Sequence, residues 1–135
     1  MSQANVELVR SIYSTGCWNS DGDPLAALAY LDEAFVFVNP PHAVLSAPRH
    51  GHEGFVAAMR NPIEAFDFWC HEPLAFHDGG DRVLVDIMLS TRGGRSGIEF
   101  HRPEWHVWTL RDEKATRVAW LEDRAEARRL AGLTG

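Results

Sequence analysis

The chain has 135 residues, of which 45% are hydrophobic and 24% are charged, as is typical of one soluble globular domain. Its formal net charge of −6 argues against a general nucleic-acid-binding protein, because such proteins carry a basic stripe. The sequence shows no signal-peptide pattern, no apolar run of the roughly 18 residues that a membrane span needs, and two cysteines without CxxC spacing. We therefore expect a cytoplasmic protein with no membrane span and no disulfide framework.

The first half of the chain carries mainly helical patterns. Apolar residues recur at steps of three and four within residues 3–16, which predicts an amphipathic helix. Asp23 before Pro24 has the residue types of an N-cap and a first helical position, and predicts a short helix over 24–32. We also predict a strand over 34–38, a loop over 41–50 and a helix over 51–60.

The second half of the chain is mainly strand. We predict strands over 68–76 and 82–91, and a hairpin over 99–123 with a tight turn at 111–114. Pro73 predicts a bulge or a sheet edge, because proline cannot donate to a strand ladder. Asp123 and Glu126 resemble a capping box that starts a closing helix. Helices followed by consecutive antiparallel strands predict one α+β domain over residues 1–135.

The hairpin has an unusual alternation of side chains. Strand residues point to opposite faces with a period of two. One face of its first strand carries Arg102, Glu104, His106 and Trp108, whereas Trp105 points to the other face. This mixed row of charged, imidazole and indole groups is unusual for a plain solvent face, so it faces either water or the inside of a pocket.

The order of the elements resembles a known superfamily. The chain is similar to the SnoaL-like branch of the nuclear transport factor two-like superfamily in the stretches NVELVRSIY, GDPLAALAYLDEAFVFVNP, HGHEGFVAAM, HVWTLRDEK and WLEDRAEA. The resemblance implies a cone-shaped, curved antiparallel sheet wrapped around the N-terminal helices, with one deep pocket, and a homodimer through the outer sheet face. The superfamily includes ketosteroid isomerases, polyketide cyclases, epoxide hydrolases, dehydratases and members that only bind partners, so the fold alone assigns no activity.

The ketosteroid isomerases give one set of residues to compare. Their general base, an Asp before a Pro, corresponds to Asn39, and an amide does not take up a proton at neutral pH. Their acid toward the oxyanion would fall at His106 or Trp105, and their helix-one Tyr lies near Tyr13.

The limonene-type epoxide hydrolases give a second set. Asn39 and Asp86 match the residues of that set, whereas Phe37, Leu84 and Trp120 stand where it has a Tyr, an Arg and an Asp. The incomplete match argues against an epoxide hydrolase.

The resemblance also implies which residues face the pocket. The candidate catalytic residues are His106, Asp86, Glu104 and Glu122. The candidate substrate-binding residues are Tyr13, Phe37, Asn39, Met88, Arg102, Trp108, Val118 and Trp120.

Each candidate has a purely structural alternative. His106 either transfers protons or is a satisfied histidine in a packed interior. Asp86 either assists His106 or forms an ion pair with Arg102 or another basic residue. Asn39 either holds an oxygen or forms a turn before two prolines. Glu122 is a second carboxylate of the site or a rim residue.

The histidine-rich stretch between the predicted loop and the third predicted helix contains side chains that can bind metals. His50, His52 and Glu53, with His42 nearby, contain ligand side chains, but no matching cluster follows them, so we expect no metal and no cofactor.

These observations favour an enzyme that performs cofactor-independent acid/base chemistry on a small, mostly apolar molecule. The reaction would be an isomerisation, cyclisation, dehydration or hydrolysis. The alternatives are a non-catalytic small-ligand binder and a protein-interaction module, the latter with its pocket filled by Trp and Phe side chains.

Overall fold

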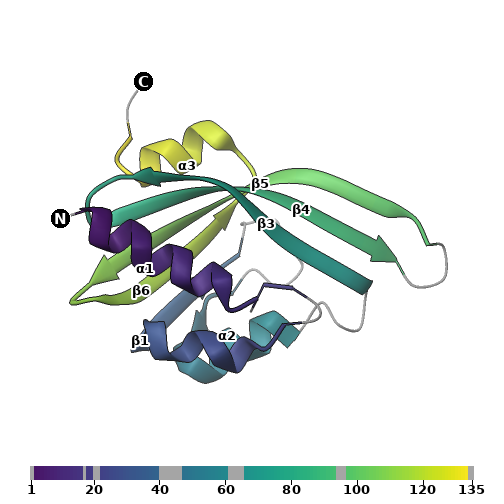
Figure 1. Cartoon of the computed structure of the whole chain (residues 1–135), viewed down its shortest axis with the longest axis horizontal. Helices are drawn as coiled ribbons and strands as arrows, with labels where there is room; N and C mark the ends of the chain where they lie inside the picture. The colour runs from purple at the N-terminus through teal and green to yellow at the C-terminus, as the bar shows by residue number, and fades with distance from the viewer. Residues whose placement is uncertain are drawn as a thin grey trace.

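One six-stranded sheet organises the computed structural model, which describes residues 2–16, 18–19, 22–39, 47–60, 66–93 and 97–133 (Figure 1). The elements in chain order are α1 (Ser2–Ser14), the 3-10 helix η1 (Pro24–Tyr30), β1 (Leu31–Val38), β2 (Arg49–His50), α2 (Gly51–Arg60), β3 (Phe66–Asp78), β4 (Arg82–Gly93), β5 (Glu99–Arg111), β6 (Lys114–Leu121) and α3 (Arg124–Leu130). The predicted α+β class is confirmed.

The sheet is curled and does not close. Its strand order is β2-β1-β6-β5-β4-β3, and among the described strands only β1 and β6 pair in parallel. This pairing places the first strand beside the last one, and the sequence did not predict it. β2 pairs with β1 through a part of the chain that was predicted as loop; residues 41–46 of that loop lie outside the described residues.

Helix caps, a proline and a hairpin turn lie at the positions that the sequence predicted. The Asp23 carboxylate accepts from the Leu25 N–H at 3.0 Å, and the Asp123 carboxylate accepts from the Glu126 N–H at 3.1 Å. The register of β3 shifts between Pro73 and Ala75, and β3 is an edge strand, so both parts of the proline prediction are confirmed. The β5–β6 turn has positive φ at Asp112 and Glu113, as a type I′ hairpin turn requires.

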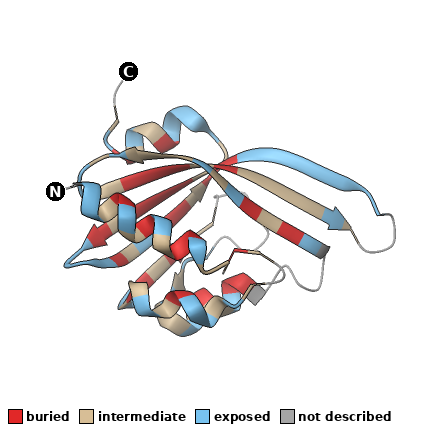
Figure 2. Ribbon diagram, viewed as in Figure 1, coloured by how far each residue is buried: buried red, intermediate tan, exposed pale blue. Residues whose placement is uncertain are grey.

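Both faces of the sheet are covered near its middle. Helices α1, η1 and α2 lie on the inner face and α3 lies on the outer face (Figure 1). The larger core fills the inner side, where Ile12, Trp18, Phe55 and Trp108 are all at most 1% exposed. Figure 2 shows the buried residues gathered beneath the helices, whereas β4 and β5 run on beyond them with more exposed residues.

Strand β4 corrects one prediction. Val83, Val85 and Ile87 face the inner core, whereas Leu84 packs in the smaller core beneath α3. The expectation that Asp86 and Met88 share the pocket face with His106 is therefore wrong. Because helices cover this strand on both sides, both of its faces are apolar, and the sequence pattern could not decide which face points inward.

None of the helices in the described part of the chain is long and apolar enough to cross a membrane.

Candidate functional site

The inner face of β5 carries a buried polar group in an aromatic surrounding. Glu104, His106 and Trp108 alternate along the strand toward the helices and are 3%, 0% and 0% exposed. Trp108 pairs with Val83 of β4 and with Val118 of β6, two residues of the inner core, so these positions share the inner face. Tyr13, from the end of α1, reaches the same place and is also buried.

A chain of hydrogen bonds joins these side chains. The Trp108 Nε1–H donates to the Tyr13 hydroxyl at 3.0 Å. That hydroxyl lies 2.6 Å from His106 Nδ1, and His106 Nε2 lies 2.7 Å from a Glu104 carboxylate oxygen. Because an ionised carboxylate only accepts, the neutral ring carries its proton on Nε2 and accepts from Tyr13 at Nδ1. We call Tyr13, His106 and Glu104 the relay.

The protonation states follow from burial and from the partners. Burial lowers the pKa of His106 below its usual value, although the hydrogen bond and the charge of Glu104 oppose this effect. Burial raises the pKa of Glu104, but the hydrogen bond from His106 and the electrostatic interactions with His106, His71 and Arg102 outweigh burial, so the net pKa is lowered. The relay therefore rests as a neutral imidazole beside an ionised carboxylate.

A second histidine belongs to the site and was not predicted. His71, on β3, is 6% exposed, and its Nδ1 lies 2.7 Å from the Trp18 carbonyl oxygen. Its Nε2 lies 3.6 Å from the same Glu104 oxygen that bonds His106. Its period-two spacing from Trp69, which is also buried, is the sequence signal that could have revealed it.

The pH dependence of stability should report on His71. Burial, partly opposed by Glu104, lowers the pKa of His71 from 6.5 to about 4. The unfolded chain therefore binds this proton below about pH 6.5 and the folded chain only below about pH 4, so stability falls as the pH falls through this window. At 1.36 kcal/mol per pKa unit, the lowered pKa of His71 makes the folded chain roughly 3 kcal/mol less stable below about pH 4 than at neutral pH. Urea unfolding of wild type and of His71→Gln at about pH 7 and about pH 5 measures this slope.

The glutamine variant should lose less stability than wild type over this pH range. His101→Gln is the matched control, because His101 is exposed on β5 and lies outside the site. Equal slopes for wild type and His71→Gln would contradict the assignment of a neutral, buried His71.

Aromatic side chains enclose the two histidines. The Trp120 ring stacks on His106 at 4.7 Å between centroids, with 7° between the planes. The Trp18 indole, from the segment between α1 and η1, lies 5.2 to 6.2 Å from the rings of Trp120, His106 and His71. The N–H groups of Trp18 and Trp120 are buried and have no hydrogen-bond partner among the described residues. Two indole N–H groups beside the relay are thus available as hydrogen-bond donors.

Arg102 and Glu122 lie at the solvent end of the same face. The Arg102 guanidinium is 3.0 Å from a Glu122 carboxylate oxygen and 3.9 Å from the second oxygen of Glu104. Its side chain is 56% exposed, whereas that of Glu122 is 26% exposed. Arg102 therefore links the buried carboxylate to the surface.

Asp86 does not join the site. On the outer face, its carboxylate lies 2.9 Å from His77 Nε2, so the predicted contact with His106 is absent. The partner is a basic residue other than Arg102, as the structural alternative allowed. Met88 lies on the same outer face. Of the other predicted residues, Phe37 and Val118 are buried in the inner core, and Asn39 is half-buried directly after β1.

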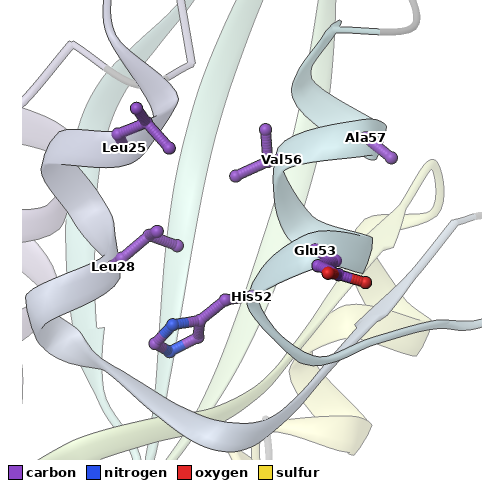
Figure 3. A pocket seen from close by; sticks show the side chains of 6 residues that line it. All are labelled: Leu25, Leu28, His52, Glu53, Val56 and Ala57. Carbon is purple, nitrogen blue, oxygen red and sulfur yellow. The ribbon is translucent and has the colours of Figure 1, made fainter.

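Two hollows lie apart from the histidine pair. The first, of about 390 Å³, lies between η1 and α2 and shares no residue with the relay (Figure 3). It contains His52, whose Nε2 lies 3.0 Å from the Leu31 carbonyl oxygen, while His50 lies on β2 and His42 lies outside the described residues. The second, of about 360 Å³, is lined by Tyr13 together with Arg10, Ser14, Pro73 and Phe76.

Comparison with known proteins identifies the fold. No curated protein matches the sequence closely enough to count as a relative. Among solved structures, TerC co-crystallised with polyporic acid is 24% identical, with a TM-score of 0.76 over 95% of this chain and 98% of that chain. A candidate SnoaL-like polyketide cyclase from Jannaschia sp. CCS1 is 18% identical, with a TM-score of 0.76 over 99% and 95%.

A third structure, from Catenulispora acidiphila DSM 44928, has a ketosteroid isomerase-like fold and was solved in complex with trimethylamine. It is 16% identical, with a TM-score of 0.72 over 95% of this chain and 94% of that chain. At these identities the structures establish the fold and not the activity. The sequence profile of the SnoaL-like domain matches residues 9–118, most of the chain. The chain therefore belongs to the SnoaL-like domain family, as the resemblance implied.

Proposed function

We propose that this protein is an enzyme that performs cofactor-independent acid/base chemistry, of the isomerase or cyclase type, on a small and mostly apolar molecule. The observation that carries the proposal is the buried chain from Tyr13 through His106 to Glu104, with contacts of 2.6 and 2.7 Å. Glu104 takes the partner role that the sequence analysis gave to Asp86. Membership of a family that includes cyclases supports this reaction class.

The relay can move a proton from one atom of the substrate to another and return to its starting protonation state. The Tyr13 oxygen takes a proton from the substrate while its own proton passes to His106 Nδ1. The imidazolium so formed stays hydrogen-bonded to the ionised Glu104, which stabilises its charge. Returning both protons along the same path delivers one to another atom of the substrate, as isomerisation and cyclisation require.

The surroundings of the relay favour a carbonyl-bearing, apolar substrate. The walls are aromatic, from Trp18, Trp108 and Trp120. The buried indole N–H groups of Trp18 and Trp120, which have no partner among the described residues, can donate to a substrate oxygen that gains charge as the proton leaves. In this proposal the two indoles, and not Asn39, hold the substrate oxygen.

Exchange of the α-hydrogens of 2-tetralone in D₂O, followed by NMR, tests the proposal without the natural substrate. This apolar ketone enolises when a positioned base removes its α-proton. Wild type should accelerate the exchange above the rate in buffer alone. A rate equal to that of buffer, with binding of 2-tetralone confirmed by tryptophan fluorescence, would instead support the non-catalytic binder.

One observation favours that second candidate. The Trp18 indole lies among the rings of Tyr13, Phe55, His106 and Trp120. An aromatic side chain of the protein itself therefore occupies part of the space at the inner face of the sheet. A binder or an interaction module would tolerate this arrangement. The homodimer and the cytoplasmic location remain predictions.

A further inference from the structure

Three side chains of the site bring metal-ligating atoms together. His71, Glu104 and His106 offer ligand atoms that all lie within 4.8 Å of one another. Their side chains are 5%, 3% and 0% exposed. Two imidazoles and one carboxylate are the ligand set of many protein sites for Zn²⁺ and for Fe²⁺. We propose that these three residues bind one divalent transition-metal ion of the Zn²⁺ type.

His71 already presents a ligand atom. Its Nδ1 contacts the Trp18 carbonyl oxygen at 2.7 Å, and a carbonyl can only accept, so Nδ1 carries the proton. The Nε2 lone pair of the neutral ring then faces the Glu104 oxygen at 3.6 Å. A cation between the His71 Nε2 lone pair and the Glu104 oxygen would interact favourably with both of these buried acceptors.

The spacing of the atoms suits a small ion. Two ligands about 2.0–2.1 Å from a tetrahedral Zn²⁺ lie about 3.3 Å apart. The separations from the shared Glu104 oxygen are 2.7 Å to His106 Nε2 and 3.6 Å to His71 Nε2, which bracket this value. Binding of the ion would draw together the three ligand atoms, which all lie within 4.8 Å of one another.

His106 can exchange its proton for the ion. The Tyr13 hydroxyl can donate or accept, so the His106 proton can move to Nδ1 and free Nε2 for the metal. Each ligand then has an outer partner: the Trp18 carbonyl for His71, Tyr13 for His106, and Arg102 at 3.9 Å from the second Glu104 oxygen. Such partners orient ligands in metal sites.

The chemistry of the ligands predicts selectivity. Two nitrogen ligands favour Zn²⁺ and Co²⁺, whereas Mg²⁺ and Ca²⁺ prefer oxygen. With the ion on Nε2, the His106 proton lies on Nδ1, the atom that must take up the Tyr13 proton, so the metal-bound form and the active relay exclude each other. Metal binding does not rest on the proposed function, since it is measured without substrate.

Titration of the chelator-treated wild-type protein tests the proposal. Co²⁺ should produce visible ligand-field bands that saturate at one equivalent and disappear when Zn²⁺ is added. Calorimetry should give one Zn²⁺ per chain and no binding of Mg²⁺. The ring-nitrogen NMR signals of His71 and His106 in wild type should shift with Zn²⁺, which identifies the ligands without any substitution.

Variants then separate ligands from their outer partners. His71→Ala should weaken Zn²⁺ binding by more than Tyr13→Phe, for which a loss of roughly 10–100-fold is expected of an outer partner. His101→Ala, at an exposed histidine of β5, the strand of Glu104 and His106, should bind as wild type does. The proposal is overturned if wild type gives no saturable Co²⁺ bands, if a thiolate charge-transfer band shows that cysteine binds instead, or if the histidine NMR signals do not move.

Discussion

Replacing His106 with glutamine is expected to lower the rate of 2-tetralone exchange by roughly 10²–10⁴-fold, the usual contribution of a positioned acid/base group. Glutamine keeps polar atoms beside Tyr13 and Glu104, but it cannot take up the proton that Tyr13 releases. The loss should appear in kcat at unchanged folding, which far-UV circular dichroism checks.

Two further variants make this test specific. Tyr13→Phe keeps the ring and removes only the hydroxyl, so it should reduce exchange to a similar extent. It should also destabilise the fold by about 1–3 kcal/mol, because it leaves the Trp108 N–H without its acceptor. His101→Gln should keep the wild-type rate. A His106→Gln protein that exchanges as fast as wild type would remove His106 from the mechanism.

Replacing Trp18 with alanine is expected to lower the free energy of unfolding by roughly 3–5 kcal/mol, the usual cost of truncating a buried tryptophan. Trp18 is 1% exposed and contacts six aromatic or imidazole rings, those of Tyr13, Phe55, His71, His106, Trp108 and Trp120. Its loss should leave a cavity beside the relay. Urea unfolding measures the cost.

Added indole shows whether that cavity binds a ligand. If the inner face of the sheet keeps its shape, indole should bind the Trp18→Ala protein and raise its Tm progressively, with the logarithm of the ligand concentration once the site is near saturation. Trp105→Ala is the control, because Trp105 packs on the outer face with the core beneath α3, away from the relay. If indole leaves the Tm of Trp18→Ala unchanged, the cavity has collapsed, and this result would count against a small-ligand site at the inner face of the sheet.

The site could be predicted from the sequence only in part. The period-two row on β5 correctly grouped Glu104, His106 and Trp108, because alternation along one strand is a local property. The same reasoning failed on β4, where apolar residues occupy both faces and Asp86 turned out to bond His77 on the outer side. His71 was missed because its role depends on Glu104, 33 residues later in the chain.

What the sequence determined by itself is therefore local. It determined the helix starts at Asp23 and Asp123, the irregularity at Pro73 and the turn at Asp112, because caps, proline and positive φ act within a few residues. It also determined the family, since the order of elements spans most of the chain.

Only the tertiary structure decided which polar groups meet. Three features depend on contacts between residues far apart in sequence: the parallel pairing of β1 with β6, the inward face of β4, and the contacts of α1 with His106 and of β3 with Glu104. A one-residue change of register reverses every side chain of a strand at little local cost, so packing of the whole sheet against its helices had to select the register. That selection placed His71 and His106 beside one buried carboxylate and Tyr13 against the other nitrogen of His106, where the proposed proton transfer and metal binding would both occur.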